Sequence, residues 1–291
     1  MKKVLSFGEI IWDIYAEEKC IGGAPFNFAA HLAQLGIQSS LFTAVGADEM
    51  GEQAKQELVQ RGVEGVFSET ARKYSTGYCL VTLDDSGKPN YELVQDVAYD
   101  HIACSSEQMT ELTEWDYDAF YFGTLAQRAA ESHNTLLHIL ETIAFREIFC
   151  DVNVRRPFCS LSTIKTCFKY ATILKISREE LPYIFEVLLP NERYEGIPEI
   201  DMRAICRHFP KIRFLVLTLD SDGGAVYDVI KNRYYFHPAL KVNVVSTVGA
   251  GDSFSAAFLA AYLQGKKPVE CLQAAIKLSA YVVSHREAVP Q

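Results

Sequence analysis

Short β-rich runs alternate with helical patterns along almost the whole chain. Runs rich in Phe, Val, Ile and Leu predict buried strands at 2–8, 39–46, 118–124, 146–153, 171–177 and 213–219. Helical periodicity separates them, at 27–36 and 49–62, each closed by a glycine, and at 133–144. Strands that alternate with helices in this way pair mainly in parallel and carry helices on both faces. The sequence therefore predicts an α/β fold around one mainly parallel central sheet.

One segment breaks this alternation. Residues 75–94, STGYCLVTLDDSGKPNYELV, have the pattern of two alternating strands around the turn DDSGKPN, with nothing helical between them. We expect such a hairpin to stand away from the main sheet as a lid, and an antiparallel extension of the main sheet is the alternative. No repeat or long linker occurs, so residues 1–291 are expected to form a single domain with this small excursion.

Charge and cysteine usage narrow the possible partners. The formal net charge is −9 and the Lys and Arg residues are scattered, which argues against a nucleic-acid partner or an anionic membrane surface. The apolar N-terminal run is interrupted by Glu9 and Asp13, unlike a signal peptide, and no apolar run is long enough to span a bilayer. Eight cysteines without a CxxC pair indicate reduced, buried thiols and no zinc site. We expect a cytoplasmic protein.

The stretch STVGAGDSFSAAFLAAYL, residues 246–263, places a small-residue turn directly before an apolar helical pattern. Gly249, Ala250 and Gly251 would let backbone N–H groups approach an anion at a helix N-terminus. Asp252 would follow in the first helical turn, where a carboxylate can accept a proton from a substrate hydroxyl. The alternative is an ordinary loop in which the aspartate only caps the helix.

A second glycine cluster also precedes a helical pattern. CIGGAPFNFAAHLAQLG, residues 20–36, places Gly22 and Gly23 where a ligand can lie against the backbone. Asn27 offers a donor and an acceptor to a hydroxyl group, and Asp13, just after the first strand, adds an acceptor. Such groups are suited to a neutral polyol, although nearby backbone amides are an alternative partner for Asp13.

Together these stretches resemble the ribokinase-like (PfkB) carbohydrate kinases. GGAPFNFAAHLAQLG at 22–36 is similar to the first family signature, and TVGAGDSF at 247–254 is similar to the second. The strand–helix order between them agrees, so the resemblance covers essentially the whole chain. Features that look closest to the fructokinase branch are the terminal AVPQ, GEIIWDI at 8–14, FGTLAQR at 122–128 and DVNVRRPF at 151–158.

The resemblance implies a three-layer ribokinase-like fold with a small β lid, formed largely by about 72–100 and a short segment near 13–22. It implies an ATP- and Mg²⁺-dependent kinase that transfers the γ-phosphate to a sugar hydroxyl, without a dedicated set of protein metal ligands. The lid would close over the sugar and exclude water. A homodimer through the lid is a further implication.

The resemblance also assigns roles to residues. Asp252 would deprotonate the acceptor hydroxyl in front of an anion hole formed by Gly249, Ala250 and Gly251. The residues implied at the sugar and at the transferred phosphate are Asp13, Gly23, Asn27, Asn153 and Arg155. Those implied at the nucleotide and at magnesium-bound water are Lys175, Glu180, Thr218, Gly223 and Thr247.

Several positions depart from the family pattern. Ser246 stands where an aspartate usually helps to hold a monovalent cation, and Glu287 stands where a glycine is common. Two changes in one place argue against activation by a monovalent cation. On the nucleotide side, Asp220 replaces a usual glycine and Ser177 a usual asparagine, which weakens the assignment of ATP.

Other functions remain open at this point. A kinase of the same fold could act on 2-keto-3-deoxygluconate, with a positive partner among Arg128, Arg155 and Arg156, or on ribose. A nucleoside acceptor would need an aromatic platform, for which Phe26 and Tyr78 are the candidates. A degenerate protein that binds a sugar or nucleotide without turnover is the third possibility, although the intact GAGD turn argues against it.

Overall fold

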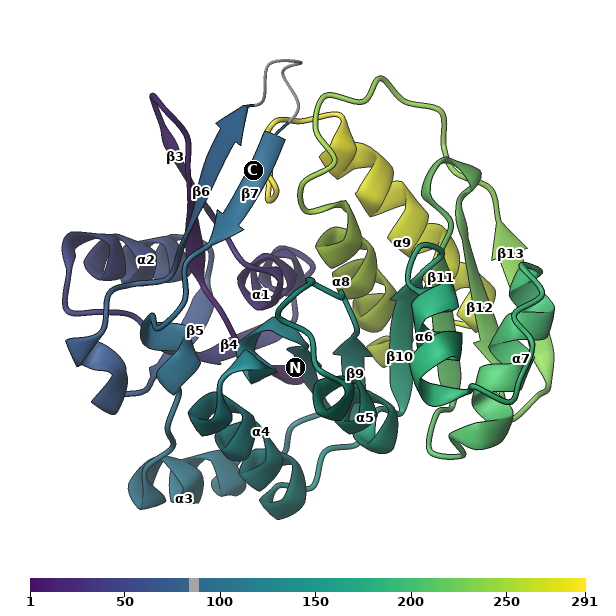
Figure 1. Ribbon diagram of the computed structural model, residues 1–291, viewed down its shortest axis with the longest axis horizontal. Coiled ribbons are helices and arrows are strands. Elements are labelled where there is room, and N and C mark those ends of the chain that lie inside the picture. The colour runs from purple at the N-terminus through teal and green to yellow at the C-terminus, as the bar shows by residue number, and fades with distance from the viewer. Residues whose placement is uncertain (84–88) are drawn as a thin grey trace.

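A nine-stranded sheet runs through the middle of the molecule (Figure 1). The computed structural model describes residues 1–83 and 89–291. The strand order is β13-β12-β11-β10-β9-β8-β1-β4-β5. The bounds are β1 Lys3–Phe7, β4 Gln38–Thr43, β5 Val63–Phe67, β8 Ala119–Gly123, β9 Glu147–Asp151, β10 Ile173–Ser177, β11 Phe214–Thr218, β12 Gly224–Asp228 and β13 Arg233–His237.

Neighbouring strands from β5 to β11 pair in parallel, and only β12 and β13 add antiparallel pairs at one edge. The mainly parallel sheet expected from the strand–helix alternation is confirmed. These two strands, and β5 at the other edge of the sheet, were not predicted. Because the strands are parallel, their carboxyl ends meet at one edge, where α/β folds bind ligands.

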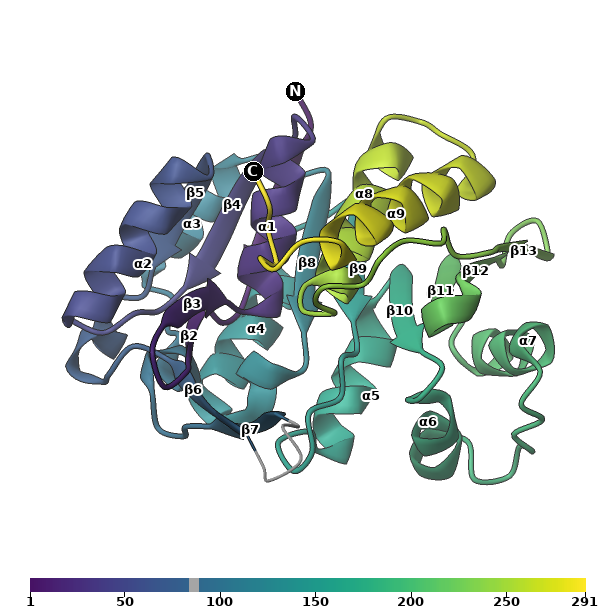
Figure 2. The same cartoon turned by 90° about the horizontal axis from the view of Figure 1, so that it is seen from above.

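Helices cover both faces of this sheet (Figure 2). On one face lie α1 Ala24–Gln34, α2 Glu49–Gln60, α8 Ala250–Leu263 and α9 Pro268–Val283. The other face carries α4 Ala130–Thr142, α5 Leu161–Tyr170, α6 Leu181–Leu188 and α7 Pro198–His208. The remaining helices are α3 Ser106–Glu114 and the 3₁₀ turns η1 Thr70–Lys73, η2 Ala98–His101, η3 Leu125–Arg128 and η4 Asp220–Asp222.

The two faces of the sheet bury separate hydrophobic clusters. In β1, Val4 packs into the cluster with α1 and α8, whereas its neighbour Leu5 packs into the cluster with α4 and α5. This follows from the alternation of side chains along a strand. Both residues are fully buried, which explains why β1 is a continuous apolar run in the sequence.

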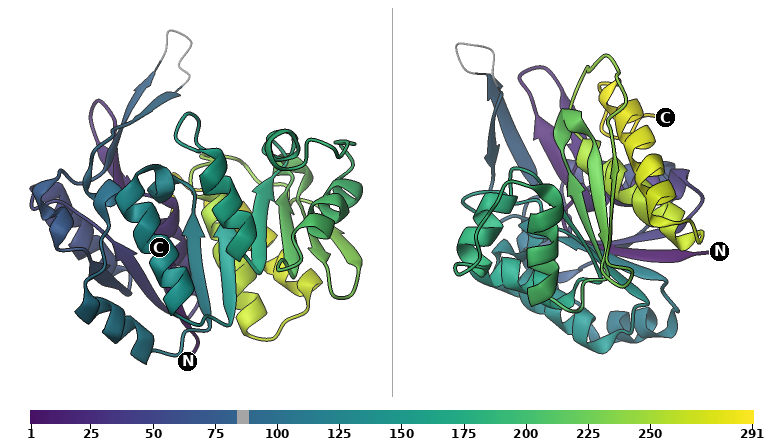
Figure 3. Two further views of the ribbon diagram at one scale, coloured as in Figure 1. Left: turned by 60° about the horizontal axis from the view of Figure 1, so that its bottom comes forward. Right: turned by 90° about the vertical axis from the view of Figure 1, so that its right-hand side faces the viewer.

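A second, four-stranded sheet has the order β3-β2-β6-β7 and projects from the body of the molecule (Figure 3). Its strands are β2 Ile11–Ile14, β3 Lys19–Gly22, β6 Tyr78–Leu83 and β7 Pro89–Leu93. The predicted hairpin is therefore present, and the alternative of an extension of the main sheet is wrong, since β6 pairs with β2. Most of its turn, DDSGKPN, lies outside the described residues.

All eight cysteines are free thiols. Six are buried, but Cys104 is half-buried and Cys20 is exposed on β3, so the expectation that all would be buried was wrong for these two. No helix within the described part of the chain is long and apolar enough to cross a membrane.

Candidate active site

The small-residue turn before α8 brings the predicted anion hole to the carboxyl edge of the main sheet. Gly249 caps α8 with φ 79°, a left-handed conformation that favours glycine, and a β carbon there would lie 2.6 Å from the Ala288 carbonyl oxygen. Ala250 and Gly251 open the helix, and Asp252 lies in its first turn, as predicted. The N-terminus of α8 thus lies where the helix dipole would stabilise an anion.

Asp252 is held by a residue from the other glycine cluster. The Asn27 Nδ2 atom of α1 donates to Asp252 Oδ2 over 2.8 Å, although the two residues are 225 positions apart. Burial raises the pKa of Asp252 to about 6, against the lowering effect of the Asn27 hydrogen bond. Asn27 is buried and its Oδ1 has no hydrogen-bond partner in the described structure. A substrate hydroxyl could donate to that oxygen.

Glu9 is a site residue that the sequence reasoning missed. It is only 4% exposed, and its Oε1 accepts the Ala24 N–H at the start of α1 over 3.3 Å. Burial raises the pKa of Glu9 to about 7, and the nearby Asp252 charge acts in the same direction. An acidic residue in the apolar run GEIIW was the available signal, but we interpreted it only as evidence against a signal peptide.

Asp13 and Gly23 lie on either side of this acidic pair. Asp13 is a half-buried residue of β2, and its carboxylate accepts no hydrogen bond from the described residues, so the alternative of backbone amide partners is wrong. Burial raises the pKa of Asp13 to about 6, while the Arg155 charge lowers it. Gly23 has φ 108° and caps α1, and a β carbon there would lie 2.6 Å from the Glu9 carbonyl oxygen. Only glycine fits this close approach.

Asn153 follows β9 at the same edge of the sheet. It has φ 41°, in the left-handed region that asparagine tolerates, and its carbonyl accepts from Thr124 Oγ1 over 3.1 Å. Its side chain has no hydrogen-bond partner among the described residues. The side chain of Asn153 therefore forms no Asx turn at the end of this strand.

Of the three arginines considered for an acidic substrate, Arg155 is the one whose side chain has no hydrogen-bond, ion-pair or ring contact among the described residues. Arg128 forms a buried ion pair with Asp100, and Arg156 lies over the Tyr183 ring at 4.1 Å. The exposed Arg155 guanidinium has no hydrogen-bond or ion-pair partner within the described ranges. Its charge lowers the pKa values of Glu9, Asp13 and Asp252, so it lies in the field of all three acids.

Lys175 is engaged behind the anion hole. Its Nζ donates to both oxygens of Asp151 over 2.9 and 2.8 Å, and Ser255 of α8 donates to the same carboxylate. Burial alone would lower the pKa of Lys175, but the Asp151 carboxylate outweighs it and the pKa is raised. The Lys175 Nζ also lies 3.3 Å from the position of a β carbon on Gly251. Asp151 and Ser255 were not assigned from the sequence.

The residues expected at the nucleotide follow β10 and β11. Glu180 accepts the backbone N–H groups of Ser177 and Val154, and burial raises its pKa. Thr218 ends β11, and Gly223 follows the turn η4. Thr247 is exposed just before the anion hole, where its carbonyl accepts from Ala250.

Comparison with known proteins shows to which family this chain belongs. The family model for pfkB family carbohydrate kinases matches residues 1–290. The chain belongs to this family. It is therefore a carbohydrate kinase, a phosphotransferase with an alcohol group as acceptor, as the two signatures indicated.

Two curated relatives illustrate the similarity. A putative sugar kinase of Pyrococcus horikoshii is 28% identical over 266 residues, which cover 87% of this chain and 77% of that protein. The fructokinase of Salmonella typhimurium is 27% identical over 286 residues, which cover 92% of this chain and 87% of that protein.

Solved structures share the ribokinase-like fold. The Pyrococcus horikoshii protein in complex with ATP matches 99% of this chain and 95% of its own, with a TM-score of 0.79 and 24% identity. A fructokinase double mutant from Vibrio cholerae, with fructose, ADP and a potassium ion bound, matches 99% of this chain and 94% of its own, with a TM-score of 0.81 and 20% identity. The predicted three-layer ribokinase-like fold is confirmed.

Two departures of this PfkB kinase from the family pattern lie near the anion hole. The Ser246 hydroxyl accepts the Val248 N–H over 3.2 Å, while the Ser246 N–H donates to Val283. Glu287 is exposed and has no ion-pair partner in the described ranges. Neither side chain therefore supplies a buried carboxylate there.

A third departure has a visible backbone consequence. Asp220 of the kinase has φ 51°, in the left-handed region, so the position has the geometry that a glycine adopts without strain.

The aromatic platforms proposed for a nucleoside are wrong. Phe26 lies on α1 and is fully buried in the core. Tyr78 pairs with Trp12, whereas Asp13 pairs with Cys79 one position along, so Tyr78 lies on the face of the small sheet opposite to Asp13. Neither ring can stack a base beside the site of this kinase.

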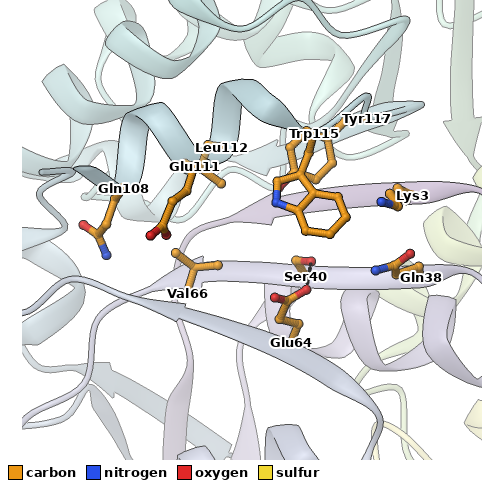
Figure 4. A pocket seen from close by; sticks show the side chains of 10 residues that line it. All are labelled: Lys3, Gln38, Ser40, Glu64, Val66, Gln108, Glu111, Leu112, Trp115 and Tyr117. Carbon is orange, nitrogen blue, oxygen red and sulfur yellow. Dashed lines mark hydrogen bonds between the residues drawn. The ribbon is translucent and has the colours of Figure 1, made fainter. Parts of the chain in front are cut away.

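A separate pocket of about 60 Å³ lies at the other end of the kinase (Figure 4). Lys3 and Gln38, which begin β1 and β4, mark the amino edge of the sheet, opposite to Asp252. Lys3 Nζ lies 3.5 Å from the centre of the Trp115 ring. The pocket is part of the packing of α3 rather than of the catalytic edge. Within the described ranges no cluster of three or more His, Cys, Asp or Glu side chains could hold a metal ion.

Proposed function

We propose that this kinase transfers the γ-phosphate of ATP to a hydroxyl group of fructose. The observation that carries the proposal is the contact between Asn27 and Asp252, which joins the polyol-binding cluster to the general base. The fructokinases among the relatives and the ATP complex of the Pyrococcus horikoshii protein support the acceptor and the nucleotide.

The chemistry follows from the positions of the polar groups. The Asn27 Oδ1 and the Asp13 carboxylate accept hydrogen bonds from sugar hydroxyls and orient the acceptor. The acceptor oxygen loses its proton to Asp252 as its bond to the γ-phosphorus forms, and the bond between that phosphorus and the bridging oxygen breaks to release ADP. Backbone N–H groups of residues 249–251 and the Arg155 guanidinium stabilise the charge on the transferred group.

The oxygen donors at the nucleotide edge fit a magnesium ion that is bound mainly by phosphates and water. Glu180 offers a carboxylate that is fixed by two backbone donors, and Mg²⁺ typically takes one or two carboxylates and keeps several waters. When bound, the ion neutralises phosphate charge. Ser246 leaves the neighbouring cation position without a carboxylate, so we propose that the kinase needs little or no potassium.

We further propose that the small sheet is the lid. One of its faces carries the half-buried Asp13 and the buried Cys79. The opposite face carries Tyr78 and Leu80, of which Leu80 is 37% exposed, while Trp12 on the same face is buried and donates to the Met50 carbonyl of α2. This outer face is where a second copy would pack to form a homodimer.

A sugar acid such as 2-keto-3-deoxygluconate is the second candidate acceptor. The unpaired Arg155 guanidinium favours it, because a carboxylate would give this cation a partner. The raised pKa values of Glu9 and Asp13 oppose it, because a third negative charge would lie close to two buried acids.

A coupled ADP-release assay with Mg·ATP separates these possibilities. The acceptors are fructose, ribose, 2-keto-3-deoxygluconate, glucose, tagatose and adenosine, each with and without potassium. We expect the highest kcat/KM with fructose and no loss without potassium. A higher kcat/KM with 2-keto-3-deoxygluconate would favour the sugar acid as the acceptor. ATP binding without turnover of any acceptor would contradict both the fructose and the sugar-acid proposals.

A further inference from the structure

Arg128 lies at the point where the small sheet joins the body of the molecule. Its side chain is 6% exposed, and its Nε and Nη2 atoms donate to the two oxygens of Asp100 over 2.6 and 2.7 Å. A bidentate, buried pair of this kind fixes the plane of the guanidinium. The pair joins η3 to η2, which are separated by 28 residues in the sequence.

The same guanidinium also holds the small sheet. Nη2 donates over 2.6 Å to the carbonyl of Val94, the residue that follows β7. The Tyr99 ring lies 4.6 Å from the guanidinium and packs against the backbone that enters β6, where a β carbon on Gly77 would lie 2.5 Å from the ring. Both strands of the hairpin are therefore anchored at Arg128.

On its other side the guanidinium contacts the loop that carries the free arginine. The Phe158 ring lies 5.0 Å from the Arg128 guanidinium. The Phe158 N–H donates to the Arg155 carbonyl over 2.7 Å, which closes a tight turn between them. A shift of Arg128 would move the Arg155 backbone together with the end of β7.

We propose that Arg128 is a positioning residue that couples the base of the small sheet to the loop of Arg155. The small sheet and the Arg155 guanidinium then reach their sugar-binding positions together. This inference rests on the proposed function for its kinetic consequence, but the mechanical coupling does not require any particular acceptor. The Nη1 atom is buried without a partner in the described structure, so the hydrogen bonds of the guanidinium are those of Nε and Nη2.

Arg128→Lys is the informative variant, because it keeps the charge opposite Asp100 but loses the planar, bidentate fork. We expect the sugar KM to rise about tenfold, since a small displacement of a positioning group has a large kinetic effect. The ATP dissociation constant should stay unchanged. Arg213→Lys is the matched control, because Arg213 pairs with the buried Glu147 over 2.6 Å at the amino edge of the sheet.

Hydrogen–deuterium exchange gives a second measurement that does not depend on turnover. In Arg128→Lys, peptides covering 89–98 and 152–160 should both exchange faster, while the peptide covering 250–263 stays as in the wild type. In the Arg213→Lys control neither of the first two should change. Faster exchange in only one of them, or an unchanged sugar KM in an active enzyme, would overturn the coupling.

If Arg128→Lys does not fold, Phe158→Leu tests the same coupling from the other side. This substitution removes the contact between the Phe158 ring and Arg128 and leaves the Arg128–Asp100 pair in place. Phe158 is not bonded to residues 89–98, so faster exchange of that peptide, which we expect, would have to be transmitted through Arg128. An unaffected 89–98 peptide would contradict the proposal. An inactive wild type with coupled exchange would contradict the proposed function alone.

Discussion

Replacing Asp252, the proposed general base, should make the protein more stable while it destroys activity. Asp252 has its pKa raised from 3.8 to about 6, chiefly by burial. At neutral pH the native state must therefore keep a carboxylate ionised where the ionised form is disfavoured. Asp252→Asn removes that charge and keeps an oxygen that can accept the Asn27 N–H.

The magnitude follows from the pKa difference. A change from 3.8 to about 6 corresponds to about 3 kcal/mol of unfavourable ionisation in the folded state. Asp252 is only half-buried, so water relieves part of this cost, and we expect a gain of about 1 to 2 kcal/mol in the free energy of unfolding. In the same variant, turnover should fall by about 10²- to 10⁴-fold, the usual contribution of a general base.

The pH dependence of the stability difference shows whether the ionisation of Asp252 causes it. Below pH 3.8 the carboxyl is protonated in both the folded and the unfolded protein, so the wild type and Asp252→Asn should be about equally stable. As the pH rises from 3.8 to about 6, only the wild type loses stability from this group, and the difference stays constant above that.

Thermal and urea unfolding of both proteins between pH 4.5 and 8 would measure this difference. A gain of 1 kcal/mol corresponds to a Tm increase of about 2 to 4 °C for a domain of this size class. Asp116→Asn serves as the control, since Asp116 is an exposed residue paired with Arg146 far from the site. An Asp252→Asn variant that is less stable at pH 7.5, or that keeps wild-type turnover, would refute the reasoning.

Three further substitutions test the surroundings of the site. Asn27→Ala removes a hydrogen bond that lowers the pKa of Asp252, so the acidic limb of the kcat/KM profile should move to higher pH while the sugar KM rises. Ser246→Asp places a carboxylate beside the anion hole and should make turnover respond to potassium, which a titration of the chloride salt at constant ionic strength would show. Asp220→Gly removes a negative charge, so the ATP KM should fall. It also replaces a residue in the left-handed conformation at φ 51°, but the relief of strain is offset by the greater entropy of glycine in the unfolded chain, so the unfolding free energy should change by less than about 1 kcal/mol.

The sequence predicted the elements whose signals are local. The helices closed by Gly36 and Gly62 end there, with both glycines in the left-handed conformation at φ 78° and 69°. The turn before α8 has the predicted position because small residues and a helix start are adjacent in the chain. Strands β5, β12 and β13 were missed, since the sequence reasoning assigned no strand to 63–67, 224–228 or 233–237.

The partners of the charged residues could not be predicted in the same way. Lys175 was expected at the nucleotide, but its Nζ is bound to Asp151, which lies on the neighbouring strand β9. That contact depends on strand order, which no local pattern encodes. The same holds for Arg128, whose partner Asp100 becomes a neighbour only when η2 and η3 pack together.

The distribution of charge in the site explains why the nucleotide must bring its own cation. Burial raises the pKa values of Glu9, Asp13 and Asp252. A further negative charge at the sugar end of the site would raise these pKa values again and favour protonation of the three carboxylates. Lys175 is neutralised by a buried aspartate, which leaves Arg155 as the one described arginine or lysine whose charge acts on all three acids. In the proposed mechanism the phosphates would therefore depend on the backbone N–H groups at the start of α8 and on a divalent ion bound to them. A neutral acceptor fits beside three acids whose pKa values are raised better than an anionic one does, which is the physical ground for proposing a sugar rather than a sugar acid.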